Sequence, residues 1–230
     1  MKSAELLRER EQRRRAYYRE SILHAAERVI VRKGYSATTM DDVAREARLS
    51  KATIYKCITG KEVLLFEILN HYFDDLRAKT EAIAAGPGTA TDRLRSVFLM
   101  ALRESEARRS LTRVLWMDKS MLKLVHLFFA SSGKSGPAAT GDRKRLNVLM
   151  EKRRALTAAG ARILSDGVAA GEFRPLDAGR AVEFLEAVVE GYTHAYLWQG
   201  GAFDPAVAAE ELTGFVLGGI RNPDRPVKEN

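Results

Sequence analysis

The spacing of the apolar residues constrains the fold of this chain more than any other feature of its sequence. Along almost the whole length, apolar residues recur at i, i+3, i+4, i+7 and i+8, which is the spacing of one face of an α-helix. Residues 22–30, 65–76 and 94–102 show it most clearly. No segment alternates apolar and polar residues with the turn chemistry of a hairpin. The sequence therefore predicts an all-α fold.

Glycine and proline divide the predicted helices. Gly86-Pro87-Gly88, residues 131–142 and Gly200-Gly201 have the composition of loops. Asp204-Pro205 predicts an N-cap followed by proline at the first helical position. After Ile220 few residues can be buried, and we expect a frayed tail. We divide the chain into residues 1–65, a larger helical domain of residues 66–220 and a tail of residues 221–230.

Positive charge is concentrated in the first quarter of the chain. The chain has a formal net charge of +8, and residues 1–62 hold 15 Lys or Arg against 9 Asp or Glu. This asymmetry favours an anionic polymer or surface as partner, although a solvated basic helix has the same composition. No apolar run is long enough to span a membrane, and charges interrupt any stretch of signal-peptide length, so we expect a cytoplasmic protein.

Residues with catalytic or metal-binding chemistry are few and scattered. Cys57 is the single cysteine, which permits neither an internal disulfide nor a metal site built on a cysteine pair. The four histidines have no paired metal spacing, and no Ser, His and Asp arrangement is recognisable. Gly133-Lys134-Ser135 resembles the end of a P-loop, but the first glycine and the preceding strand are missing. We expect no enzyme activity, no metal and no cofactor.

Two capping patterns near the N-terminus predict a helix-turn-helix. Thr39 followed by Asp42 resembles a capping box and begins a short helix. Ser50 is the next N-cap candidate, so a second short helix begins at Lys51 after a tight turn. Two such helices, braced by a preceding amphipathic helix, form a DNA-binding unit. Ile54 of the second helix faces inward, and four side chains are available to DNA: Lys51, Thr53, Tyr55 and Lys56.

Residues 22–65 resemble the DNA-binding module of the TetR family of bacterial transcriptional regulators. The residues that carry the resemblance are Ala25-Ala26, Gly34-Tyr35, Thr38-Thr39, Val43-Ala44, Ala47, Ser50, Thr53-Ile54-Tyr55 and Lys61-Glu62. The resemblance implies a three-helix module that reads DNA with its third helix, followed by a larger helical domain for dimerisation and ligand binding.

The resemblance also implies roles for single residues. Lys51 and Thr53 would lie nearest the base edges, whereas Thr39, Tyr55 and Lys61 would contact phosphates, because helix N-termini and lysines attract them. Thr39 could instead serve only as a cap, and Tyr55 could pack against the first helix. The complete predicted DNA-binding set is Thr39, Ser50, Lys51, Thr53, Tyr55, Lys56 and Lys61.

The chain departs from the family pattern in three residues and has a basic N-terminus. Arg48 replaces the turn glycine, so a non-glycine residue is expected at positive φ, at a cost of roughly 1 kcal/mol. Cys57 and Ile58 replace an aromatic pair, which removes one expected phosphate contact. Residues 8–19 are rich in arginine and either extend the first helix or form an arm for the minor groove.

The final two helices supply the predicted dimer interface. Helix-turn-helix proteins usually dimerise so that two recognition helices reach successive major grooves, and in the TetR family the last two helices generally do this. Ordinary core packing is the alternative role. The predicted interface residues are Val182, Leu185, Val189, Tyr192, Tyr196, Leu212, Phe215, Val216 and Ile220.

Five aromatic and methionine residues are candidates to line an effector cavity or, alternatively, to form core: Trp116, Met117, Met121, Phe128 and Phe129. By family analogy, a hydrophobic or aromatic effector there would release a palindromic operator. The resemblance thus implies a homodimeric, ligand-responsive repressor. The alternative is a helical partner-binding or DNA-architectural protein without effector or operator specificity. Effector identity, operator sequence and the direction of regulation are not encoded in the chain.

Overall fold

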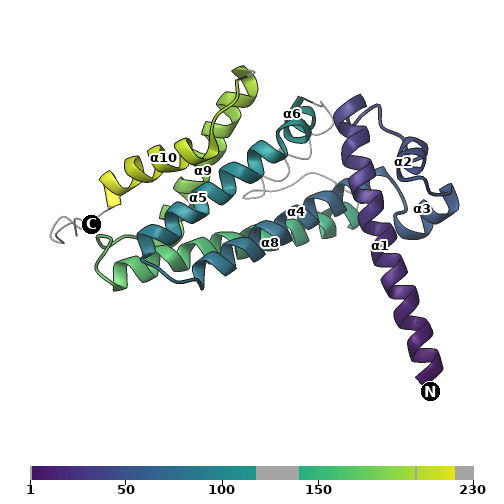
Figure 1. The fold of residues 1–230 in the computed structure, drawn as a ribbon, viewed down its shortest axis with the longest axis horizontal. Helices are drawn as coiled ribbons and strands as arrows, with labels where there is room; N and C mark the ends of the chain where they lie inside the picture. Colours follow the sequence, from purple (N-terminus) through teal and green to yellow (C-terminus); the bar gives the residue numbers. More distant parts are fainter. Residues whose placement is uncertain (1, 118–139, 200, 221–230) are drawn as a thin grey trace. The chain divides into compact units, whose positions relative to one another are not determined.

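The computed structural model describes residues 2–117, 140–199 and 201–220, and the regular elements in these ranges are α-helices (Figure 1). The all-α prediction is confirmed. No helix in these ranges is long and apolar enough to cross a membrane. In chain order the helices are α1 (Lys2–Lys33), α2 (Met40–Ala47), α3 (Lys51–Cys57), α4 (Lys61–Ala84), α5 (Ala90–Ala107), α6 (Arg109–Met117), α8 (Thr140–Ala169), α9 (Ala178–Gln199) and α10 (Pro205–Ile220).

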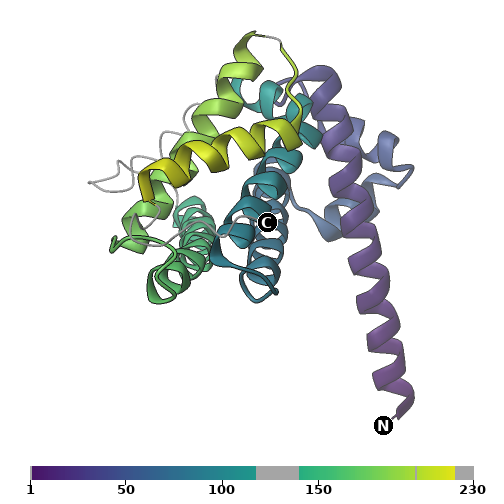
Figure 2. The same ribbon diagram turned by 60° about the vertical axis from the view of Figure 1, so that its left-hand side comes forward.

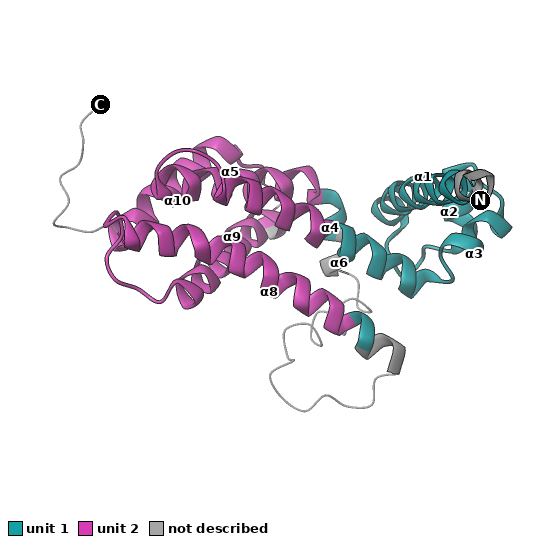
Figure 3. Cartoon of the chain, turned by 90° about the horizontal axis from the view of Figure 1, so that it is seen from below, with its two compact units in different colours: residues 1–71, 110–145 teal, residues 72–109, 146–230 magenta. Residues whose placement is uncertain are grey.

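The chain divides into two compact units (Figure 3). The first comprises residues 1–71 and 110–145, and the second comprises residues 72–109 and 146–230. Our boundary after residue 65 differs from this division, because the first unit keeps the first turns of α4. It also takes in most of α6, whose Leu111 is buried in the core of the first unit. The helices α4 and α8 each contribute to both units.

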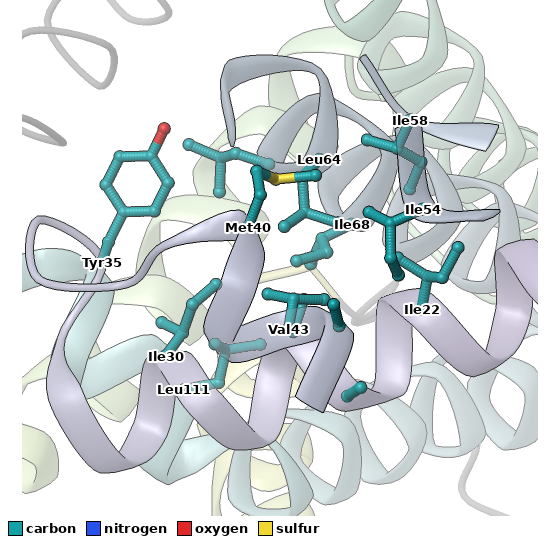
Figure 4. Packing of buried hydrophobic residues seen from close by; sticks show 14 residues of the cluster. Ile22, Ile30, Tyr35, Met40, Val43, Ile54, Ile58, Leu64, Ile68 and Leu111 are labelled. Carbon is teal, nitrogen blue, oxygen red and sulfur yellow. The ribbon is translucent and has the colours of Figure 1, made fainter. Parts of the chain in front are cut away.

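The core of the first unit joins α1 to the helix-turn-helix (Figure 4). The apolar face predicted for α1 is fully buried, which confirms the helical period: Ile22, Ala25, Ala26, Val29 and Ile30. Opposite it lie Val43 of α2, Ile54 of α3 and Leu64 of α4, all without solvent exposure. Hydrophobic burial of this face therefore holds α2 and α3 in place.

The second unit has its own core, formed by α5, α8, α9 and α10. Gly167 of α8 lies against the buried ring of Phe173, where a Cβ atom would come within 2.2 Å of the ring. In the turn that follows α8, the Glu172 carboxylate accepts hydrogen bonds from the backbone N–H groups of Ala90 and Thr91, both at 3.1 Å. Glu172 thus caps the N-terminus of α5, whose first N–H groups have no partner inside the helix.

The helix boundaries agree with most of the predicted turns. A turn at Gly86-Pro87-Gly88 separates α4 from α5. Asp204 caps α10 by accepting from the N–H of Ala206 at 2.7 Å, and Pro205 is the first helical residue, as predicted. The predicted loop of residues 131–142 overlaps α8, which already begins at Thr140. The rest of that loop and the tail of residues 221–230 lie outside the described residues.

Most of the residues predicted for the dimer interface pack inside the second unit. Val182 and Val216 are buried there, and the Tyr196 ring packs 4.9 Å from that of Tyr192. Phe215 is the exception, because 78% of its surface is exposed. Most of the predicted residues therefore contribute to the core of the second unit, and the two helices are apolar on more than one side. The remaining five residues pack partly buried against the same core: Leu185, Val189, Tyr192, Leu212 and Ile220.

Candidate nucleic-acid interface

Thr39 begins α2 with the capping box that the sequence predicts. Its hydroxyl oxygen accepts from the Asp42 N–H at 3.2 Å, and its own N–H donates to the Asp42 carboxylate at 3.2 Å. The residue is nevertheless exposed. Thr39 therefore combines a structural cap with a position at a helix N-terminus, where a phosphate is favoured.

Arg48 forms the turn between α2 and α3 in the left-handed conformation, at φ 55° and ψ 39°. It is the one non-glycine residue with positive φ in the described part of the chain, which confirms the expectation from the sequence. Its N–H donates to the Arg45 carbonyl at 3.2 Å, and the Leu49 N–H donates to that of Ala44 at 3.0 Å. These two bonds are the pattern of a Schellman motif, which ends α2 and turns the chain into α3.

The recognition helix α3 has one buried and one exposed side. Ile54 is fully buried, whereas Lys51, Tyr55 and Lys56 are exposed, with 49% of the Tyr55 surface open to solvent. Tyr55 is therefore not held within the core. Ser50 caps the helix by accepting from the Thr53 N–H at 3.1 Å, and the two hydroxyls lie 2.8 Å apart.

Lys51 pairs with a residue of α2. Its ammonium lies 2.5 Å from the Asp41 carboxylate, and both side chains are largely exposed. The pair orients Lys51 on the outer surface of the helix-turn-helix. Exposed ion pairs contribute only about 0–1 kcal/mol, so a DNA acceptor can replace Asp41 at little cost.

Lys61, predicted as a phosphate ligand, closes the turn between α1 and α2. Its ammonium donates to the carbonyls of Tyr35 at 3.2 Å and Ser36 at 3.0 Å, and lies 4.8 Å from the centre of the Tyr35 ring. A lysine ammonium has three donors. Two are used inside the module, and the third remains for a phosphate.

Basic residues at the end of α1 hold two carboxylates of α2, a contact that our sequence interpretation missed. Arg28 and Arg32 donate to Glu46 at 2.8 and 3.0 Å, and Lys33 donates to Asp42 at 2.7 Å. The Arg28 and then the Arg32 hydrogen bonds lower the pKa of Glu46, and those from Lys33 and Thr39 lower the pKa of Asp42 to about 2. The i, i+4 spacing of Arg28 and Arg32, matched by that of Asp42 and Glu46, was the available signal.

The unusual end of α3 is packed apolar structure. Ile58 is 1% exposed and donates its N–H to the Ile54 carbonyl at 2.8 Å, so it ends the helix. Cys57 is partly buried against the same core. Neither residue presents a strong hydrogen-bond donor at this end of the helix.

The chain was compared with known proteins. The sequence model of one protein family, the bacterial regulatory proteins of the tetR family, matches residues 22–68. These residues contain the whole helix-turn-helix. The DNA-binding module of the chain is therefore a TetR-family module. YuxN, an uncharacterized HTH-type transcriptional regulator of Bacillus subtilis, is 36% identical over 53 residues, covering 23% of this chain and 18% of that protein. That likeness spans less than a quarter of either chain.

Two further similarities cover most of the chain. KstR2, an HTH-type transcriptional repressor of Mycolicibacterium smegmatis, is 23% identical over 205 residues, or 88% of this chain and 90% of that protein. The solved structure of PfmR, a TetR family transcriptional regulator from Thermus thermophilus, has a TM-score of 0.65 and 22% identity, and the match covers 86% of this chain and 97% of that one. The structural likeness therefore extends through both units.

The helix α1, which has 32 residues, carries many basic residues in its N-terminal part. Residues 8–19 continue α1, so the predicted extension of the helix is confirmed and the alternative of a non-helical arm is not. Glu9 pairs with Arg13 at 4.0 Å and Glu11 with Arg15 at 3.0 Å, both at the i, i+4 spacing that stabilises a helix. In Figures 1 and 2 this part of α1 projects beyond α2 and α3.

The predicted effector residues lie largely beyond the described structure. Met121, Phe128 and Phe129 are outside the described residues, and Trp116 and Met117 belong to the last turn of α6, whose side chains are not described. Among the described residues no group of His, Cys, Asp or Glu could hold a metal ion.

Proposed function

We propose that this TetR-family regulator is a homodimeric repressor that acts in the cytoplasm, binds a palindromic operator through α3 and releases it when a small-molecule effector binds. The observation that carries the proposal is the two-sided α3, with Ile54 buried and Lys51, Tyr55 and Lys56 exposed. A helix of this kind, second in a helix-turn-helix, suits the major groove. The name of KstR2, a repressor similar over 88% of this chain, supports the direction of regulation.

Within the proposal, Lys51 and Thr53 read bases and the other residues fix the register. Lys51 exchanges Asp41 for a base acceptor, and Thr53 turns its hydroxyl from Ser50 toward the groove. Thr39, Tyr55 and Lys61 contact phosphates, which position the protein but carry no sequence information.

We place the dimer interface on the exposed sides of α9 and α10. Phe184 and Phe215 are 65% and 78% exposed, and Val188 is 40% exposed, although each belongs to a helix whose other side is core. Exposed apolar patches of this kind mark association sites. At Gly214 and Gly218 of α10 a Cβ atom would meet nothing within 4 Å, so a partner helix has room to approach closely.

The effector is assigned to residues 116–129 by their composition and by the family resemblance. A hydrophobic or aromatic compound suits this segment, which contains Trp116, Phe128 and Phe129. Its binding would stabilise a conformation with lower operator affinity, so effector and DNA would weaken one another's binding by the same factor. Titration of a preformed complex with a panel of such compounds tests this, and insensitivity to all of them would count against it.

Selection of bound DNA from a random pool tests the main proposal against the alternative of an architectural DNA-binding protein. A dimeric repressor is expected to enrich one inverted repeat whose half-sites lie about one helical turn apart. An architectural protein would bind without enriching a sequence. A catalytic role would require turnover of a substrate, for which no constellation of residues was found in the sequence.

A further inference from the structure

The exposed N-terminal part of α1 carries positive charge that the module's own structure does not use. The side chains of residues 8–17 are exposed, and Tyr17 is 69% exposed. Arg13 and Arg15 pair with glutamates of α1 itself, and Arg19 pairs with Glu67 of α4. Arg10 and Arg14 have no carboxylate partner among the described side chains, which begin at residue 8. Uncompensated arginines on an exposed helix suit an anionic partner.

Helix geometry places these two arginines on the side of α1 that faces the helix-turn-helix. Arg10 and Arg28 are eighteen residues apart, which is about five turns of 3.6 residues, so they lie on the same face of the helix. Arg28 binds Glu46 of α2 at 2.8 Å. Arg14 and Tyr17 follow Arg10 at i+4 and i+7 on that face. The stripe is thus aligned with the helix that crosses the DNA backbone in such modules.

The distance along α1 also suits a duplex. Ile22 packs beside Ile54 of the recognition helix (Figure 4), so α1 passes α3 at this point. At 1.5 Å per residue, Arg14 and Arg10 lie roughly 12 and 18 Å further along the helix. The major groove is about 12 Å wide and is bordered by phosphates. Both arginines therefore lie a groove width or more from α3, where the backbone that borders the groove is the part of a duplex within their reach.

We infer that the N-terminal part of α1 is a second DNA-binding element, which binds the phosphate backbone beside the groove read by α3 through Arg10 and Arg14. The inference rests on the proposed function only in taking DNA as the partner of the module. The element contacts backbone, so it adds affinity and salt dependence without changing base preference. It also lengthens the stretch of duplex that each subunit protects.

The composition of the element favours DNA over a membrane surface. Interfacial helices bury a broad apolar face among the lipids. In residues 8–17 the sequence REREQRRRAY offers only Ala16 and Tyr17 for such a face. The charge pattern therefore matches a phosphate backbone in water and lacks what insertion into lipid requires.

The test compares two double variants of the full chain. Arg10→Ala with Arg14→Ala removes the proposed contacts and keeps a good helix former at both positions. Arg162→Ala with Arg180→Ala removes the same charge from exposed positions of the second unit. Binding to a random-sequence duplex and to any selected operator is measured over a range of KCl concentrations, with helix content checked by circular dichroism. Vesicles of anionic phospholipid serve as a second probe.

The first double variant is expected to lower the salt slope of log K by about 0.9 per lost contact, or roughly 1.8 per chain, on both duplexes. The matched variant should leave the slope unchanged. Equal slopes for the two variants would overturn the inference, as would vesicle binding that needs Arg10 and Arg14 while DNA binding does not. If no operator can be selected, the proposed function fails, whereas the slope on random duplex still decides the role of α1.

Discussion

Arg48 and Asp42 show how single residues fix the turns that present α3. Arg48 takes the left-handed conformation that ends α2, and Asp42 ties the start of α2 to both Thr39 and Lys33. The backbone at Arg48 is strained, because a residue with a Cβ atom stands where glycine would carry no strain. The contacts of Asp42 depend on its negative charge, so their contribution to stability changes with pH.

Replacement of Arg48 by glycine is expected to stabilise the module. A residue with a Cβ atom at φ 55° carries about 1 kcal/mol of strain that glycine does not. Arg48→Gly should therefore raise the free energy of unfolding by about that amount in urea titrations. Arg48→Ala is the matched control, because it removes the same charge and keeps the Cβ atom. Equal effects of the two substitutions would show that the side chain matters and the backbone does not.

Asp42 is expected to make the first unit sensitive to acid. Its pKa is lowered from an ordinary value of 3.8 to about 2 by the hydrogen bonds from Lys33 and Thr39. Because the folded pKa is depressed, the ionised carboxylate stabilises the fold above about pH 4, and this stabilisation is lost as pH falls toward 2. Asp42→Asn should thus be less stable than the wild type at neutral pH, with a difference that narrows below pH 4. A difference that stays constant with pH would contradict this account.

At the scale of helices, local signals made α2 and α3 predictable. The capping residues Thr39 and Ser50 and the tight turn at Arg48 act within a few residues of one another, so the sequence contains them completely. Contacts between helices were harder to foresee. The bonds from Lys61 to the carbonyls at residues 35 and 36 depend on packing that no local pattern specifies. For the bond from Arg28 to Glu46, the matched i, i+4 spacing on α1 and α2 is a signal, but it does not say that the two helices meet.

The close contact between α8 and Phe173 gives a test of packing in the second unit. Gly167→Ala would place a methyl group 2.2 Å from a ring that is itself 1% exposed, so the ring must move within a filled core. We expect a loss of roughly 1–3 kcal/mol in the free energy of unfolding. Gly179→Ala, where the nearest atom is 3.4 Å away in the first turn of α9, should be neutral or stabilising. A tolerated Gly167→Ala would mean that the core around Phe173 relaxes easily.

At the scale of the whole molecule, the sequence does not separate core-facing from exposed apolar residues on the last two helices. The helix α9 is apolar on more than one side, and periodicity alone does not tell the stripe that faces its own core from a stripe that faces a partner. Leu185 packs against the core of its own unit, whereas Phe184 is exposed and belongs to the interface that we propose. Only the tertiary packing of the second unit separates them.

This distinction predicts different outcomes for two charge insertions. Phe215→Glu changes an exposed residue and is expected to give folded monomers by light scattering, with weakened operator binding. Leu185→Glu places a charge in the partly buried layer against the core and is expected to lower the thermal stability of the chain itself. A stable dimer of Phe215→Glu with full operator affinity would move the interface elsewhere.

The central claim is that α3 reads the operator, and base preference tests it most directly. Selections from a random DNA pool are carried out with the wild type, with Lys51→Ala and with Thr53→Val, and with Lys61→Ala as a variant of a backbone-contacting residue. The account predicts that substitutions at Lys51 and Thr53 change the enriched bases within each half-site, whereas Lys61→Ala keeps the consensus and weakens binding to all sequences alike. An unchanged consensus for both α3 variants, or a new one for Lys61→Ala, would contradict the assignment of α3 as the reading helix.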